Sequence, residues 1–455
     1  MVGNKHNKTI LSLAVAVGLS FSSTAMADGS EMDALYDRIE ALEAQVQALI
    51  KSQQPALEPI PAVDTAVTKA TANKAAETKA TEVLAQHKAE VAEDEHKHSY
   101  KFGGYIKLDT LLSDYSGGSV ASGTAGRDFY IPGLIPVGNS AGESYLDIHA
   151  RESRINFSSK HLLDNGATMR TYFELDFLIG QGGNERISNS YTPRLRHAFF
   201  TYNKWTFGQT WTTFFNVSAQ PENLDFVGPA ESIVFGRQAM IRYTSGPWQF
   251  AIENPETTIT PYGGGGRIVT DDNLMPDVVL RYNLKSNWGS FVVAGTLRQL
   301  AYENQAAGID DSIMGYGLSL SGKMKVGDKN DFRWMATVGS GMGRYFGLNL
   351  VNSSVLDANG KLEAIDSYGM FGSYRHFWNN QWRSNFTLGY SSVDNNTALT
   401  GFGVTSKASS AHINLIYSPL PKIDFGLELM IAEREIESGL NGDLTRFQFS
   451  AKYGF

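Results

Sequence analysis

The chain ends, from residue 444 to residue 455, with the sequence LTRFQFSAKYGF. Apolar and aromatic residues alternate with polar and charged ones: the first set is Phe447, Phe449, Ala451, Tyr453 and Phe455, and the second is Arg446, Gln448, Ser450 and Lys452. A period of two indicates a β-strand with one apolar face. Strands of soluble sandwiches average about five or six residues, whereas a tilted strand needs about ten to cross a membrane. The length of this segment therefore favours a membrane-spanning strand.

The same alternation recurs in sixteen segments of residues 100–455. They begin near Lys101, Tyr145, Gly166, Pro193, Lys204, Gly236, Gly246, Pro276, Trp288, Asp311, Asp331, Glu363, Trp382, Ser409, Lys422 and Leu444. Short links such as 203–204 and 379–380 alternate with longer loops, as periplasmic turns alternate with extracellular loops in bacterial barrels. The sequence therefore predicts an all-β transmembrane barrel of about 16 antiparallel strands.

Composition supports this class. A chain of 455 residues would ordinarily form about three domains. However, 45 Gly, 20 Tyr and 25 Phe beside only 19% charged residues favour turn-rich β structure. The lack of Cys excludes disulfides and Cys-ligated metal sites, and a net charge of -8 offers no footprint for nucleic acid. His87, His96 and His98 lie in a charged segment and are interpreted as solvated, so neither a metal nor a cofactor is predicted.

The first 27 residues have the order of a cleavable secretory signal. Lys5 and Lys8 precede the apolar stretch 10–19, and Ala25 and Ala27 provide a small-x-small cleavage site. The alternative is a transmembrane anchor, but ten residues of helix cover only about half of a ~30 Å hydrocarbon layer. We expect cleavage after Ala27.

Residues 28–50 predict a short coiled coil. Apolar residues fall at heptad a and d positions: Met32, Leu35, Ile39, Leu42, Val46 and Leu49. The alternative is an amphipathic helix that packs on its own protein. Residues 51–99 contain Pro55, Pro59 and Pro61 but no Phe, Trp or Tyr, which predicts a disordered linker before the barrel at 100–455.

Cations collect on the polar side of the predicted strands. Those expected to line the pore are Lys107, Arg151, Arg154, Arg170, Arg194, Arg196, Arg242, Arg281, Arg298 and Arg333, with Arg383 and Arg446 on the same side. Because Arg stays charged and grips carboxylates, an inward array of Arg selects and guides anions. Alternatively, these cations neutralise inward acids such as Asp109, Glu174 and Asp176 and stabilise the wall. Arg151 and Arg154 differ in parity, so a bulge lies between them or one faces lipid or a subunit boundary.

A long apolar connection follows the fifth predicted strand. Residues 211–235 read WTTFFNVSAQPENLDFVGPAESIVF, and such a segment is a liability on a solvent loop. We expect it to fold into the lumen as a constriction loop, where Glu222, Asp225 and Glu231 would face wall arginines across a transverse field. A lid outside the barrel is the alternative.

Several motifs resemble the DcaP-like family of Gram-negative outer-membrane porins. They are the N-terminal heptad helix, YIKLD (105–109), ARESRINF (150–157), YFELDF (172–177), RLRHAFFTY (194–202), GQTWTTF (208–214) and the terminal YGF (453–455). The resemblance implies a trimer of barrels with a periplasmic coiled-coil extension and uptake of small organic anions, especially dicarboxylates. It also implies that Arg194 and Arg196 lie in the pore wall.

The predicted function is therefore an outer-membrane porin for passive diffusion of small anions, and not an enzyme. Its expected partners are outer-membrane lipid, two further copies of itself, small organic anions and a possible periplasmic partner of the N-terminal region. Three alternatives stay open: a sugar or general-diffusion porin, a barrel enzyme and an envelope tether. The G-x-S-x-G pattern at 138–142 lies between predicted strands rather than at a strand-to-helix turn, which disfavours the enzyme.

Overall fold

The computed structural model describes residues 97–179 and 186–455. The predicted signal peptide, the coiled-coil seam at 28–50 and the linker up to residue 96 lie outside these residues. The first strand begins at His98, two residues before the predicted start of the barrel. Within the described ranges, no helix is long and apolar enough to cross a membrane.

A single antiparallel sheet closes on itself because β1 pairs with β21, the last strand of the chain. β2 and β3 lie end to end along β1, so the 17 strands of the sheet fill sixteen positions of the wall. The wall strands are β1 (His98–Tyr115), β2 (Glu143–His149), β3 (Arg154–Leu162), β4 (Thr168–Asp176), β5 (Arg194–Tyr202), β6 (Trp205–Trp211), β7 (Arg237–Ser245), β8 (Trp248–Glu253), β11 (Asp277–Ser286), β12 (Gly289–Asn304), β13 (Ile309–Val326), β14 (Asn330–Ser340), β17 (Asp366–Phe377), β18 (Trp382–Asp394), β19 (Thr405–Leu420), β20 (Ile423–Ile436) and β21 (Asn441–Gly454). The predicted barrel of 16 strands is confirmed.

Side chains alternate between the two faces of this wall. On β21, Phe447 and Tyr453 are 46% and 52% exposed on the outside, whereas Arg446, Gln448 and Ser450 are buried on the inside. Apolar residues thus face outward and polar residues inward, as lipid outside and a polar interior require. The residue parity read from the sequence therefore gives the correct side of the strand.

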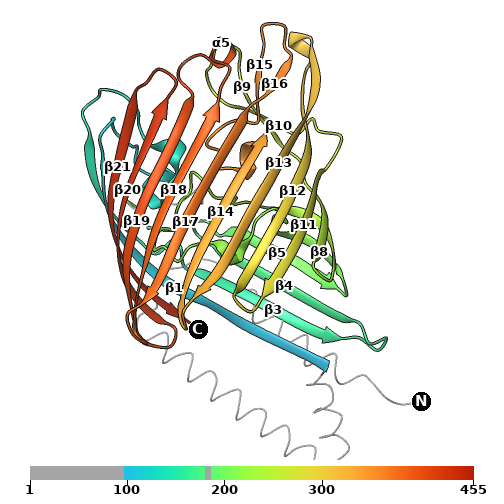
Figure 1. Ribbon diagram of the computed structural model, residues 1–455, viewed down its shortest axis with the longest axis vertical. Helices are drawn as coiled ribbons and strands as arrows, with labels where there is room; N and C mark the ends of the chain where they lie inside the picture. The colour runs from blue at the N-terminus through green and yellow to red at the C-terminus, as the bar shows by residue number, and fades with distance from the viewer. Residues whose placement is uncertain (1–96, 180–185) are drawn as a thin grey trace, which may run out of the picture. The chain divides into compact units, whose positions relative to one another are not determined.

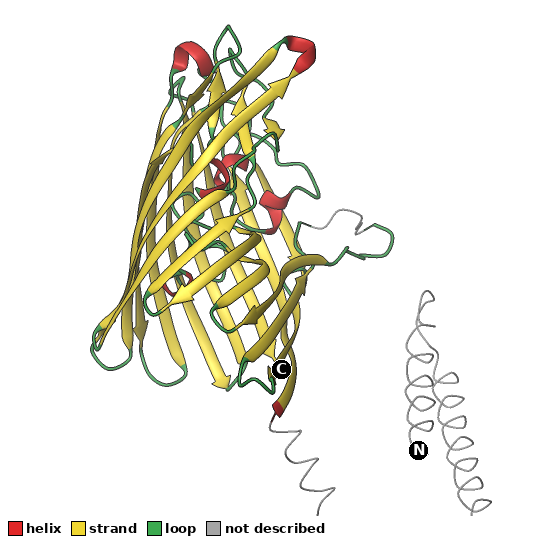
Figure 2. Ribbon diagram, turned by 90° about the vertical axis from the view of Figure 1, so that its right-hand side faces the viewer, coloured by secondary structure: helices red, strands yellow, loops and turns green. Residues whose placement is uncertain are grey.

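The two ends of the barrel differ. Short turns, the start of β1 and the C-terminus share one end, and the longer loops share the other (Figure 2). In bacterial barrels the short turns are periplasmic. At the other end lies a small four-stranded sheet of β9 (Thr257–Thr260), β10 (Ile268–Thr270), β15 (Ser354–Leu356) and β16 (Leu362–Ala364) (Figure 1).

The wall is low on one side. Strands β3 to β8 have only 6 to 9 residues each, whereas the wall strands β12, β13, β14 and β17 to β21 have 11 to 18 (Figure 1). β2 stands above this low side, and among the described residues it pairs with β1 alone. One edge of β2 therefore has no strand partner within residues 97–179 and 186–455.

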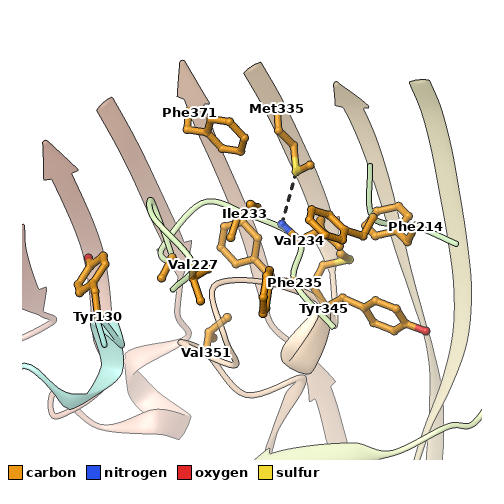
Figure 3. Packing of buried hydrophobic residues seen from close by; sticks show 14 of the residues in the cluster. Tyr130, Phe214, Val227, Ile233, Val234, Phe235, Met335, Tyr345, Val351 and Phe371 are labelled. Atoms are coloured by element: carbon orange, nitrogen blue, oxygen red, sulfur yellow. Dashed lines mark hydrogen bonds between the residues drawn. The ribbon is translucent and has the colours of Figure 1, made fainter. Parts of the chain in front are cut away.

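Three loops pack together inside the wall. They are residues 116–142, which include α4 (Ala125–Asp128) and η1 (Pro132–Leu134); residues 212–236, with η2 (Val217–Ala219); and residues 341–365, with η4 (Gly343–Tyr345). Their apolar side chains form one buried cluster with inward residues of the wall, among them Met335 of β14 and Phe371 of β17 (Figure 3). The remaining short helices, η3 (Gln305–Ala307) and α5 (Thr397–Thr400), lie in other loops.

Candidate functional site: the inner loop and its charged wall

Residues 212–236, called here the inner loop, connect β6 to β7. Phe214, Ile233 and Val234 are at most 1% exposed, and the backbone N–H of Val234 points at the sulfur of Met335 at 3.4 Å (Figure 3). Burial of such side chains contributes roughly 1.5–3 kcal/mol each, which is enough to keep an apolar loop against the wall.

Glycines of the wall allow the inner loop to come close to the backbone of the strands. A Cβ at Gly389 of β18 would overlap the carboxylate of Glu231. A Cβ at Gly426 of β20 would lie 2.6 Å from the side chain of Leu224. Glycine at these two inward-facing positions thus leaves the space that the inner loop occupies.

The three acids of the inner loop have different surroundings. Glu222 forms ion pairs with Arg375 at 3.0 Å and Arg383 at 2.8 Å. Asp225 accepts hydrogen bonds from the backbone N–H groups of Tyr130, Val227 and Gly228, and its nearest cation, Arg446, lies 3.9 Å away. Glu231 is fully buried and accepts a hydrogen bond from Ser410. The transverse field expected from three acids therefore rests mainly on Glu222.

The pKa values of the three acids follow from these surroundings. Burial raises the pKa of Asp225 and of Glu231 above the ordinary range of a carboxyl group. Burial would also raise the pKa of Glu222, but the hydrogen bonds and positive charges of Arg383 and Arg375 outweigh it and lower that pKa. Glu222 is thus the loop acid that is held in its charged form.

A buried polar cluster on β19 and β20 fixes the middle of the inner loop. Glu428 accepts hydrogen bonds from the backbone N–H of Leu224 at 2.7 Å and from the side chain of Asn414 at 3.0 Å. His412 lies 3.2 Å from the same carboxylate. Because each of these wall groups is buried, losing one partner would leave another polar group unsatisfied.

Three of the predicted pore-lining cations, and Arg446 on the same side of the wall, are instead buried. Lys107 is 5% exposed, Arg196 and Arg446 are 1% exposed, and Arg298 is completely covered. Arg298 donates to the carbonyl oxygens of Gly341 and Met342, and Arg446 donates to Ser113 and to the carbonyl of Gly126. These side chains hold the loops against the wall and do not contact open water.

The other two buried cations, Arg196 and Lys107, form ion pairs. Arg196 is bound by Glu174 at 2.6 Å and Asp176 at 2.9 Å. Lys107 contacts Glu152 and Asp109 and donates to the carbonyl of Leu224. Arg194 also binds Asp176, at 2.6 Å, but keeps part of its surface exposed. This is the neutralising arrangement that the sequence left open as an alternative.

The parity conflict between Arg151 and Arg154 is resolved by a break in the strand. Residues 150–153 separate β2 from β3. Arg151 binds Asp128 at 2.7 Å, and Arg154 lies over the ring of Tyr105 and 3.6 Å from Glu174. The predicted bulge is therefore a full interruption, and both side chains contact inward-facing or loop residues.

Five arginines follow the first part of the inner loop from below. This arginine row consists of Arg242, Arg281, Arg333, Arg375 and Arg383, all partly exposed. Arg281 lies at the middle of its strand, and the others lie in the half of their strands near the short turns. Arg242 donates to the carbonyl of Trp211 and Arg281 to that of Phe215. Arg333 donates to the carbonyl of Gln220, and the last two bind Glu222. The row thus follows residues 211–222 in order.

The row carries more positive than negative charge. Among the described residues, its ion pairs are with Asp331, Glu222 and Asp424, so five guanidinium groups meet three carboxylates. Arg242 and Arg281 form no ion pair with any described carboxylate, because neutral oxygens occupy their donors. Their charge is therefore not neutralised by a described carboxylate.

Comparison with known proteins fits this architecture. The family model described as DcaP outer membrane protein matches residues 20–455. The chain belongs to the DcaP family. The crystal structure of the outer membrane channel DcaP of Acinetobacter baumannii is 21% identical and matches with a TM-score of 0.65, covering 79% of this chain and 98% of that one. This DcaP-family protein is an outer-membrane β-barrel of a Gram-negative bacterium.

Two further solved structures match with lower scores. OmpF of Salmonella typhi, in complex with daunomycin, is 10% identical with a TM-score of 0.49, and covers 79% of this chain and 98% of its own. The trimer form of OmpT of Vibrio cholerae is 12% identical with a TM-score of 0.47, and covers 79% and 99%. No curated protein matches the chain significantly.

The sequence missed two cations of this DcaP-family channel. Arg375 belongs to the arginine row and shares parity with the inward Ser373, which could have revealed it. Arg237 begins β7 and lies over the ring of Trp211 at 4.7 Å, and its parity gives no such signal. Arg170, which was predicted, is exposed and pairs across the strands with Lys160 near the short turns.

Other motifs are also placed. The stretch 138–142 lies in the loop just before β2, so no strand-to-helix turn forms there. In the part of the chain that the structure describes, no group of three or more His, Asp or Glu side chains could hold a metal ion.

Proposed function

We propose that this DcaP-family channel admits small organic anions, dicarboxylates among them, by passive diffusion past the arginine row. The excess of guanidinium over carboxylate groups beneath the inner loop carries the proposal. Partly exposed Arg attracts carboxylates and binds them bidentately, and a row of several such side chains suits a solute with two carboxylates. The inner loop serves as the constriction that brings the solute to the row.

The test is the reversal potential of the purified channel in planar bilayers under a gradient of KCl. We expect preference for chloride over potassium, and blockade of the current by succinate added on the side of the short turns. Variants of the arginine row are compared with the control Lys361→Gln, which removes an exposed loop cation 2.9 Å from Asp311. Preference for potassium would exclude the proposal, and current flow unaffected by any dicarboxylate would exclude that substrate class.

We also propose that the functional unit is a homotrimer in which neighbouring copies cover the low side of the wall. The strands β3 to β8 are short, and β2 has one unpaired edge. Unpaired backbone groups are strongly disfavoured in lipid, so a covering protein surface is needed there. Residues 28–50 would strengthen the trimer as a periplasmic coiled coil, and residues 51–99 would tether it. Light scattering of the full channel should give three copies, and a monomer at working concentrations would refute this assembly.

A further inference from the structure

A small cavity of about 130 Å³ lies at the end of the barrel that carries the longer loops. The small sheet, the loop at 341–365, the loop after β18 and the adjoining ends of β19 and β20 surround it (Figure 1). Its polar lining residues are Thr260, Arg267, Asn352, Asn395, Thr405 and Arg434, and none of the described residues that line it is acidic. Arg434 shares parity on β20 with Glu428 and Met430, which are buried on the inside. The cavity therefore belongs to the interior of the barrel.

Arg434 reaches the cavity from β20. Its Nε donates to the hydroxyl of Thr405 at 2.9 Å, and its Nη1 donates to the carbonyl oxygens of Gly133 and Ile135 at 2.9 and 3.1 Å. Among the described residues, its Nη2 has no hydrogen-bond partner and its side chain has no ion pair, although it is partly exposed. Neutral oxygens thus fix the guanidinium group and leave its charge without a counterion.

Arg267 reaches the same cavity from the loop between β9 and β10. Its Nε donates to the side-chain oxygen of Asn352 at 2.5 Å, and its Nη2 donates to the carbonyl of Asn349 at 2.7 Å. Its Nη1 has no hydrogen-bond partner in the part of the chain that the structure describes, and the charge of Glu256 acts on Arg267 from beyond ion-pair distance. Two positive charges that share a small cavity repel each other, so a bound anion would relieve that repulsion.

Two threonine hydroxyls complete the polar lining. Thr405 accepts a hydrogen bond from Arg434, and Thr260 accepts one from the side chain of Asn352 at 2.8 Å. Both threonines are 4% exposed, and a hydroxyl that accepts a hydrogen bond keeps its own hydrogen to donate. Two guanidinium groups and two hydroxyl groups are donors that suit a carboxylate. Since one water takes about 30 Å³ in the liquid, the cavity has room for roughly four waters, or for one carboxylate and the first carbons of its chain.

We propose that this cavity, called here the mouth subsite, binds one carboxylate group of an organic anion that enters from the end with the longer loops. The inference rests on the proposed uptake of organic anions, because it names the place where such a solute is first bound. Arg434 lies about ten residues after Asp424, which pairs with Arg383 of the arginine row. At about 3.3 Å per residue the two places are roughly 33 Å apart along the strand, so a small solute cannot contact both at once. The solute therefore leaves the mouth subsite before it reaches the arginine row.

Protection of a thiol tests the mouth subsite, because the chain contains no Cys of its own. Gly403→Cys places one thiol in the lining, at a position where no atom lies within 4 Å of the added Cβ. The full channel in detergent is treated with the uncharged reagent methyl methanethiosulfonate, in potassium succinate or in KCl of equal ionic strength. Mass spectrometry measures the rate of modification. We expect succinate at twice its Kd to slow this rate about threefold.

Variants in the Gly403→Cys background assign the protection to the two arginines. Arg267→Gln and Arg434→Gln should each raise the half-protecting concentration of succinate about tenfold, since each removes a charge-assisted hydrogen bond. Lys361→Gln, which removes an exposed loop cation, should leave it unchanged. Heat-modified migration in gels confirms that each variant forms a barrel. Because Arg434 also holds the loop at 116–142, Arg267→Gln decides the result if Arg434→Gln does not fold.

A second thiol controls for the reagent. Ala306→Cys lies in η3, in another loop, where Ala306 is exposed, and it should be modified at the same rate in both salts. Equal rates for Gly403→Cys in succinate and chloride would overturn the proposal, as would protection that survives both arginine changes. Protection by potassium phosphate without protection by succinate would replace the carboxylate with an inorganic oxyanion.

The outcome is separable from that of the proposed function, because modification is measured without ion flow. A channel that prefers potassium but keeps a succinate-protected thiol would exclude anion uptake past the arginine row and retain the mouth subsite. An anion-selective channel with an unprotected thiol would exclude the mouth subsite alone.

Discussion

Two groups of cations point to the inside of the same barrel and have different surroundings. Arg298 and Arg446 are buried, and each donates to backbone carbonyls of the loops that pack inside the wall. The arginine row lies beneath the inner loop and stays partly exposed. Strand parity is the same for both groups, so the side of the strand does not decide whether an arginine can act on a solute. The loops decide whether an arginine is accessible: they cover Arg298 and Arg446, whereas they contact the arginine row and leave it partly exposed.

The largest effect is expected from Arg298→Ala. The change would leave the carbonyl of Gly341 without the donor Arg298 and the carbonyl of Met342 with the backbone N–H of Tyr345 alone. A buried group left without a partner costs about 1–3 kcal/mol. Urea titration of the folded barrel in detergent should therefore show a large loss of stability. Channels that remain folded should keep their ion preference, and a changed preference would place Arg298 with the row.

Gly389→Ala comes next. The new methyl group would overlap Glu231 and push the inner loop away from β18, at a cost of about 1–3 kcal/mol for overpacking. The single-channel conductance should change together with the stability. Gly403→Ala is the matched control, because no atom lies within 4 Å of its added Cβ. Equal conductance in both variants would show that the loop does not set the size of the passage.

The double change Arg242→Gln and Arg281→Gln removes the two row members without an ion pair. At about 8 Å in water one elementary charge contributes about 0.5 kcal/mol, so two charges favour a passing anion by about 1 kcal/mol and disfavour a passing cation by about the same amount. Removing both should therefore lower the ratio of anion to cation permeability by up to about thirtyfold. The reversal potential measures this ratio, and stability should change little. If the ratio is unchanged, the charge of these two side chains does not reach the solute.

The smallest effect is expected from pH. Glu222 has a lowered pKa, so its carboxylate stays charged through the ordinary titration range of a glutamate, near about 4.3, and takes up a proton only below it. Protonation would release the charges of Arg375 and Arg383 and raise anion preference. Reversal potentials should therefore be flat from neutral pH to about pH 5 and shift toward anions below the ordinary glutamate range. Glu222→Gln should show the shifted value already at pH 7.

Sequence alone predicted the barrel and the side of most strands because lipid outside and polar groups inside impose a period of two along each strand. It also located the break near Arg151 and Arg154, since their parity could not be reconciled within one regular strand. The sequence could not predict which groups the inward side chains contact. The carbonyls that cover Arg298 come from residues 341 and 342, and the donor of Glu231 is Ser410. Such contacts depend on how separate loops fold against one another, which no local pattern records.

The pairing of β1 with β21 has a consequence for assembly. Tyr105 to Tyr115 bond to residues 444–454, so the two strands that close the cylinder are among the last to meet along the chain. Until they meet, the sheet has two open edges, which lipid cannot satisfy, and contacts of such long separation form slowly. A chain truncated before residue 444 would therefore leave this edge of β1 unpaired during membrane insertion. The barrel closes only when β21 pairs with β1, so a closed wall requires an intact final strand.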